Sequence, residues 1–184
     1  CPADRKLYAL RDVTATVDSI PLICASIMSK KLAEDLTGLV LDVKYGNGAF
    51  MKTLDDAEKL ARTLVSTGVH NGVEVHALIT DMNQPLGRFA GNSLEIFECL
   101  EIFKGKKFLS SVDRDLYQDT RELSLQLASH MIFLGGAAKD LGEAYKKCET
   151  VLENGAAFRK FQEICRLQGG DLEKLPLNWN EKTV

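Results

Sequence analysis

Ser26 and Lys30 are the first side chains whose types and spacing suggest chemistry. They lie four residues apart within residues 19–34, where apolar residues recur at the spacing of one helical face. Residues four apart stack on one side of a helix, so the hydroxyl and the ammonium would lie side by side, away from the apolar stripe. Arg11 lies just upstream, and its guanidinium can reach the same face.

A hydroxyl together with two cations suits a flat polar heterocycle that carries carbonyl oxygens, as a pyrimidine base does. When the bond between such a base and a sugar breaks, the base leaves with negative charge spread onto its oxygens. Fixed cations aimed at those oxygens would stabilise the transition state more than the ground state. The alternative interpretation is an ordinary solvated helix face, on which Ser–Lys pairs of this spacing are common.

The elements that must position these residues alternate between helix and strand and then become mainly helical. Ser19 can cap the first helix, and Thr53 with Asp56 resembles the capping box of the next. Short apolar runs rich in branched residues suit buried parallel strands. The expected elements are helices at 19–34, 53–68, from 92, 116–134, 140–152 and 155–167, with strands at 38–43 and 73–80.

This order predicts an α/β fold with a parallel-sheet core, because strand–helix–strand units form parallel crossovers. Two strands are too few for a stable doubly wound sheet. We therefore expect a helix-rich, incomplete core whose other strands lie outside this chain. The apolar spacing in the helix at 116–134 predicts a buried seam of Leu123, Leu127, Met131 and Leu134.

Composition narrows the class of protein. The 184 residues carry 23 basic and 26 acidic side chains, interspersed and summing to −3, so a nucleic-acid partner is not expected. The chain has no apolar run long enough to span a membrane. Five irregularly spaced cysteines without a Cys-x-x-Cys favour reduced thiols in a cytoplasmic protein over a disulfide framework or a zinc site. We assign His70, His76 and His130 structural roles.

Several strings in the chain resemble one enzyme family. They are specific over the first hundred residues and thin out towards the C-terminus. The matching strings are residues 8–31, 41–53, 66–68, 81–87, 91–95, 134–136 and 168–171. Together they are similar to the signature regions of thymidine phosphorylases and pyrimidine-nucleoside phosphorylases. The resemblance implies a nucleoside phosphorylase and phosphoribosyltransferase-like fold.

The resemblance also implies an activity and its residues. The family transfers a pentose reversibly between a pyrimidine base and phosphate, so phosphate is the second substrate and no organic cofactor is needed. Arg11, Ser26 and Lys30 fall on the family's base-binding positions, with Tyr8 beside the base. Arg11 and Lys30 are then the catalytic cations. This assignment agrees with the helix face deduced from spacing.

A potassium ion is a further implication of the resemblance. Some bacterial members hold one with two main-chain carbonyls and a carboxylate, at positions that match Leu86, Phe89 and Glu98 here. The turn at 46–48, Gly-Asn-Gly, follows the first strand and is expected to border the active site. As a phosphate cradle its signal is weak, and a plain glycine turn is an equal alternative.

The family's phosphate site uses a Lys-His-Ser motif that this chain does not contain. The chain also begins with Cys1 rather than methionine. We therefore expect a central fragment that lacks the N-terminal phosphate-binding segment and the C-terminal domain. Residues 1–35 would belong to a small helical, base-binding domain and residues 36–184 to the large α/β domain.

Such a fragment is expected to be inactive alone. The full-length parent enzyme is expected to be a homodimer. Two alternatives remain open. One is an anthranilate phosphoribosyltransferase-like enzyme, which shares the fold. The other is a non-catalytic module that binds a nucleobase or a partner.

Overall fold

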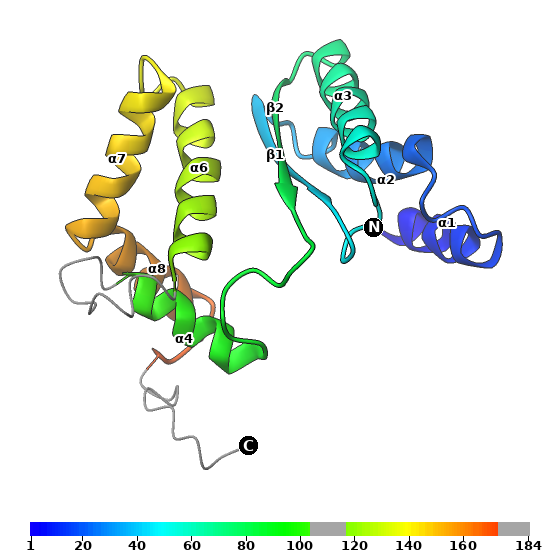
Figure 1. Ribbon diagram of the computed structural model, residues 1–184. Helices are drawn as coiled ribbons and strands as arrows, with labels where there is room; N and C mark the ends of the chain where they lie inside the picture. Colours follow the sequence, from blue (N-terminus) through cyan, green and yellow to red (C-terminus); the bar gives the residue numbers. More distant parts are fainter. Residues whose placement is uncertain (104–116, 173–184) are drawn as a thin grey trace. The chain divides into compact units, whose positions relative to one another are not determined.

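The computed structural model describes residues 1–103 and 117–172 (Figure 1). They divide into two compact units, one made of residues 1–85 and 130–139 and the other of residues 86–103, 117–129 and 140–172. The elements are α1 (Pro2–Val13), α2 (Ile20–Leu32), β1 (Gly38–Tyr45), α3 (Leu54–His70), β2 (Glu74–Asp81), α4 (Asn92–Phe103), α6 (Gln118–Leu134), α7 (Leu141–Glu153) and α8 (Ala156–Leu167).

The first unit is built on a two-stranded parallel sheet. β1 and β2 run in register from Gly38 opposite Glu74 to Tyr45 opposite Asp81. Helix α3 connects them and packs on both strands, and α2 packs on α3. Side chains alternate across a strand, so one face of the sheet faces these helices and forms the core with them. The predicted α/β class, with a parallel crossover and few strands, is confirmed.

Local signals explain these elements. The Thr53 hydroxyl accepts a hydrogen bond from the Asp56 amide at 3.2 Å, which confirms the predicted cap of α3. Gly68 lets α3 approach the sheet, because a Cβ there would meet a methyl of Val75 at 2.2 Å. Ser19 does precede α2, but its side chain makes no capping hydrogen bond. Ser19 is therefore the N-cap residue, as predicted, but the predicted hydrogen bond from its side chain is absent.

Helix α1 was not among the expected elements. Its first turn contains Pro2, which is tolerated there because the first amides of a helix lack intrahelical partners, and Asp4, whose charge suits the helix dipole. Most of its surface is exposed, including the side chains of Leu7, Leu10 and Val13. Arg11 is the buried residue of this helix.

The second unit is helical in its described residues. α8 packs against α7 and α4, and Phe103 of α4 contacts Phe158 and Phe161 of α8. The predicted seam of the helix at 116–134 is wrong. Met131 is 63% exposed, whereas the buried residues of α6 are Arg121, Leu125 and Ser129.

A buried charge explains why the buried face of α6 differs from the predicted seam. The Arg121 guanidinium reaches Glu149 at 3.4 Å and Glu153 at 3.1 Å, both from α7. An arginine can be buried when carboxylates pair with it, and hydropathy does not register that pairing.

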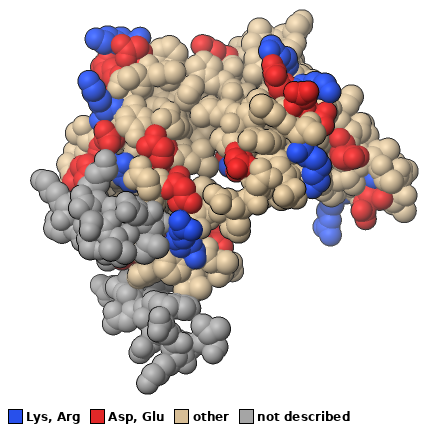
Figure 2. All heavy atoms as spheres, in the orientation of Figure 1, with Lys and Arg blue, Asp and Glu red and all other residues tan. Residues whose placement is uncertain are grey.

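The remaining features of the fold are its surface charge, the length of its apolar helices and its division into domains. Basic and acidic side chains of the described residues are interspersed on the face drawn in Figure 2. Within the described ranges, no helix is long and apolar enough to cross a membrane. Residues 1–35 fall in the same compact unit as β1, α3 and β2. The domain boundary expected at residue 35 concerns a longer protein and stays a prediction.

Candidate functional site

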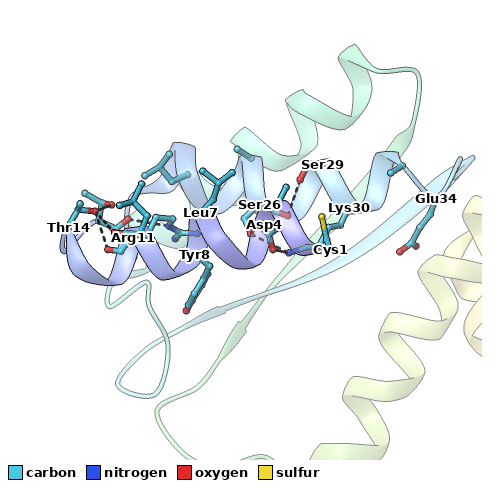
Figure 3. A pocket seen from close by; sticks show the side chains of 16 residues that line it. Cys1, Asp4, Leu7, Tyr8, Arg11, Thr14, Ser26, Ser29, Lys30 and Glu34 are labelled. Atoms are coloured by element: carbon cyan, nitrogen blue, oxygen red, sulfur yellow. Dashed lines mark hydrogen bonds and ion pairs between the residues drawn. The ribbon is translucent and has the colours of Figure 1, made fainter.

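A groove of about 790 Å³ lies between α1 and α2 (Figure 3). Both helices and the loop that joins them line it, so the site belongs wholly to the first unit. All four residues predicted to bind a base contribute to its wall: Tyr8, Arg11, Ser26 and Lys30. Their binding of a base stays a prediction.

Ser26 and Lys30 lie together, as their spacing predicts. The Lys30 ammonium donates to the Ser26 hydroxyl oxygen at 3.3 Å. Asp4 of α1 bridges the pair from the opposite side of the groove. One oxygen of its carboxylate accepts from the Ser26 hydroxyl at 2.7 Å, and the other accepts from Lys30 at 2.5 Å. The three side chains form one cluster across the two helices (Figure 3).

The electrostatics of this cluster follow from its contacts. Hydrogen bonds from Lys30, and then from Ser26, hold the pKa of Asp4 below its ordinary value. The carboxylate is therefore charged at neutral pH and fixes the ammonium in place. The side chain of Lys30 is still 40% exposed, so the ammonium also faces the open groove.

Sequence reasoning missed Asp4, although a signal was present. Asp4, Tyr8 and Arg11 are spaced four and three residues apart, which places them on one face of a helix. Once α1 is recognised from the proline and the acid of its first turn, this face presents an anion, an aromatic ring and a cation. That combination would have nominated Asp4 as a partner for the lysine of α2.

Arg11 lies at another end of the groove, near Thr14 (Figure 3). Its guanidinium donates to the main-chain oxygens of Thr16 and Val17. It also lies 5.2 Å from the centre of the Tyr8 ring, within range of a cation–π contact. In the described residues no hydrogen bond joins Arg11 to Ser26 or Lys30. The expected three-donor face is thus divided into two clusters along one groove.

This arrangement can bind a flat ligand with hydrogen-bond acceptors. Lys30 has a third ammonium hydrogen for a ligand at one position, where Ser26 already donates its single hydrogen to Asp4. Arg11 offers a second cation further along. Apolar groups lie between them, including Leu7, Leu10 and Leu22, which are exposed in this chain. A groove with apolar walls and few convergent polar groups is the usual form of a small-molecule site.

The glycine turn after β1 is held by protein contacts. The amide of Asn47 donates to the Asn83 side chain at 3.0 Å, and the amide of Gly48 donates to the Met82 carbonyl at 2.9 Å. A Cβ on Gly46 would meet the Asn83 side chain at 2.7 Å. The turn therefore interlocks with the segment after β2. These two amides already have acceptors, which favours the glycine-turn interpretation over a phosphate cradle.

Glu98 and the loop before α4 meet in the second unit. The buried Glu98 carboxylate accepts from the amides of Arg88 and Phe89 at 3.0 and 3.2 Å, and from the Thr120 hydroxyl at 2.6 Å. Phe89 and Glu98 are thus in contact, and they are two of the three residues expected to hold a potassium ion; the third is Leu86, and the ion site stays a prediction. Hard cations take oxygen ligands, and a carboxylate has about four lone-pair positions, so the donor set fits such an ion.

Most of this chain is similar to a known protein family. A profile described as "Glycosyl transferase family, a/b domain" matches residues 1–158. The chain belongs to this glycosyl transferase family. The match extends over the groove, the sheet and most of the helices of the second unit.

Curated relatives of this glycosyl transferase chain are named pyrimidine-nucleoside phosphorylase. One from Staphylococcus haemolyticus (strain JCSC1435) is 51% identical over 171 residues, which is 93% of this chain and 37% of the relative. Another, from Staphylococcus aureus (strain USA300), is 50% identical over 170 residues, covering 92% of this chain and 37% of the relative. The chain therefore spans little more than a third of the length of these relatives.

Proposed function

We propose that the protein to which this chain belongs catalyses the reversible phosphorolysis of pyrimidine nucleosides. Base and pentose 1-phosphate would be the products, so the enzyme is a pentosyltransferase. The observation that carries the proposal is the Asp4–Ser26–Lys30 cluster in an apolar groove. The identity of about half the aligned residues to proteins named pyrimidine-nucleoside phosphorylase supports the same conclusion.

The chemistry assigns a task to each side chain. Lys30 would donate to one edge of the bound base, and the Ser26 hydroxyl would do so by turning its hydrogen away from Asp4. As the glycosidic bond breaks, negative charge grows on the carbonyl oxygens of the base. Lys30, with Arg11 further along the groove, would stabilise that charge, and the stabilisation is larger in the transition state than before it. Tyr8 would lie beside the base.

The phosphate side of the reaction would come from outside this chain, because the sequence contains no Lys-His-Ser. We propose that the 184 residues by themselves bind a base weakly and do not turn over. In the longer protein, closure of the base side onto the phosphate side would bring the reactants together and exclude water. The non-catalytic alternative predicts that adding the missing parts restores no activity.

Three finer properties belong to the proposal. Thymidine, uridine and deoxyuridine are the expected substrates. A cytoplasmic homodimer joined through the helical domain is the expected assembly. The main-chain oxygens of Leu86 and Phe89, with the Glu98 carboxylate, would hold a potassium ion, whose charge would steady the loop around Glu98.

Titration of the 184-residue chain with thymine and with uracil tests the base site. Calorimetry or ligand-observed NMR supplies the affinity. Arg11→Ala with Lys30→Ala should abolish binding, because both cations are removed from the groove. Lys31→Ala is the matched control, since Lys31 pairs with Glu34 at 3.6 Å and does not line the groove.

The outcomes separate cleanly. Binding by the parent chain and by the Lys31 variant, lost in the double variant, supports the assigned roles. Equal affinity in all three chains would refute them. A folded parent chain that binds neither base would show that the groove does not recognise pyrimidines without the rest of the protein.

A further inference from the structure

His76 and His130 form a pair that the proposed function does not use. The Nδ1 atoms of their rings lie 2.8 Å apart. His76 belongs to β2 and His130 to α6, and both lie in the first unit. Both side chains are half-buried. The pair sits on the face of the sheet opposite the core, because Val75 and Ala77, its neighbours along β2, point into that core.

Packing on both sides fixes the orientation of the rings. The two imidazoles meet edge to face, with centroids 5.0 Å apart. Phe133, one turn after His130, stacks on His76 with centroids 6.0 Å apart. The end of α6 is held close to the sheet at Gly38, where a Cβ would meet the Leu134 Cβ at 3.4 Å. The two nitrogen atoms are thus positioned by the backbone of a strand and of a helix.

The environment favours an uncharged ring at His130. Burial, and then the neighbouring His76, lower the pKa of His130 below its ordinary value. A neutral imidazole is the form that coordinates a metal ion. A hydrogen bond between the two Nδ1 atoms requires that one of them carries a hydrogen and donates it to the other.

The distance between the nitrogens selects among metals. With metal–imidazole bonds of about 2.0–2.1 Å, two ligands at a right angle place their nitrogens about 2.8–3.0 Å apart. The tetrahedral angle preferred by zinc would need about 3.3–3.4 Å. The 2.8 Å of the hydrogen-bonded pair is close to the separation that a right angle needs, as in square-planar or octahedral coordination. Cu²⁺ and Ni²⁺ prefer such tetragonal arrangements.

We propose that His76 and His130 form a binding site for a divalent transition-metal ion of the Ni²⁺ or Cu²⁺ type. Both Nδ1 atoms coordinate the ion, and the hydrogen shared between them moves to the Nε2 of its own ring. No proton is released in this tautomer exchange, and no electron is transferred. Among the described residues, no third His, Cys, Asp or Glu joins the pair to complete a metal cluster. Water completes the coordination, and the ion ties the end of α6, residues 130–134 of the first unit, to the sheet.

The test uses Ni²⁺ with the full 184-residue chain. Calorimetry gives the affinity, and NMR of the three histidine rings reports which of them the paramagnetic ion broadens. Variants His76→Gln and His130→Gln each remove one ligand and keep a polar side chain. His70→Gln is the matched control, because His70 is exposed at the end of α3 and contacts Ser66 of its own helix.

We expect two ring signals to broaden together, and Ni²⁺ affinity to fall at least about tenfold in either variant while His70→Gln binds like the parent. Ni²⁺ should also raise the melting temperature of the parent and of the control, because it binds only the folded pair. Ni²⁺ that broadens a single ring, or binds the two variants as tightly as the parent, would overturn the proposal. Zn²⁺ binding as tightly as Ni²⁺ would overturn the right-angle geometry.

Discussion

Asp4 and Glu98 are two carboxylates with opposite kinds of partners. Both of the hydrogen bonds to Asp4 come from side chains, Ser26 and Lys30, which line an open groove. Glu98 is 4% exposed, and two of its donors are main-chain amides of the loop wrapped around it. A Cβ on Gly87 would meet a Glu98 carboxylate oxygen at 2.2 Å, so the loop fits closely.

The difference separates an open groove, whose donors can change partners, from a loop that the Glu98 carboxylate holds in place. The side chains that donate to Asp4, Ser26 and Lys30, can turn to a ligand at little cost in free energy. Main-chain amides cannot turn without reshaping the loop, and a buried amide that loses its acceptor costs free energy. We therefore expect changes at Glu98 to affect folding first and changes at Asp4 to affect binding first. Each of the following experiments tests this distinction between an effect on folding and an effect on binding.

Glu98→Ala should have the largest effect. It leaves three part-buried donors without their acceptor, the amides of Arg88 and Phe89 and the Thr120 hydroxyl, and each should cost about 1 kcal/mol, at the low end for an unsatisfied donor. We expect the free energy of unfolding to fall by about 2–4 kcal/mol in urea unfolding, with faster hydrogen exchange at these two amides. Glu58→Ala, on an exposed pair with Arg62, should cost less than about 1 kcal/mol. Equal losses in the two variants would contradict a structural role for Glu98.

Asp4→Asn should change binding rather than folding. The amide keeps the size of the side chain but loses the charge that positions Lys30, so we expect affinity for uracil to fall about fivefold to tenfold. Asp12→Asn, on the exposed face of the same helix, is the control and should bind like the parent. Calorimetry measures both. Unchanged affinity in Asp4→Asn would remove Asp4 from the site.

Thr120→Val should have a smaller effect than Glu98→Ala. It removes the hydroxyl donor to Glu98 and leaves both amide donors in place. We expect a loss of about 1 kcal/mol in the free energy of unfolding, as for a single hydrogen bond. A loss as large as that of Glu98→Ala would mean that the hydroxyl, rather than the loop, holds the carboxylate.

The pH dependence at Asp4 should be the smallest effect. Its pKa in the folded chain lies below the unfolded value, so its contribution to stability is present above about pH 3.8 and is lost as the pH falls through the lower folded pKa. NMR titration of the carboxyl carbon should show this lowered pKa. Lys30→Met should return the pKa towards its ordinary value, because Lys30 is the first cause of the shift. An unchanged pKa in that variant would assign the shift to Ser26.

Periodicity and capping predicted much of the first unit. The Thr53–Asp56 contact and the apolar runs placed α3 and both strands to within a few residues, since their signals are local. The i, i+4 spacing of Ser26 and Lys30 likewise predicted their contact. Contacts formed within one turn or one strand leave a direct trace in the sequence.

Long-range pairing left at most an indirect trace, such as the spacing that places Asp4 on one face of α1. The bond from Lys30 to Asp4 joins residues 26 positions apart, and the buried Arg121 depends on carboxylates of α7. Hydropathy therefore placed the seam of α6 on leucines and Met131 instead. The position of Arg11 against the loop oxygens also depends on how the chain turns after α1, which spacing does not specify.

The exposed side chains of α1 have a consequence for handling the chain in solution. Leu7, Leu10 and Val13 are 61%, 57% and 82% exposed on one short helix. Apolar surface of this kind lowers colloidal stability, and sulfate or phosphate salts strengthen the tendency of such surfaces to associate. Light scattering should therefore show an apparent mass that rises with protein concentration and with added sulfate. A Leu10→Lys variant should suppress that rise.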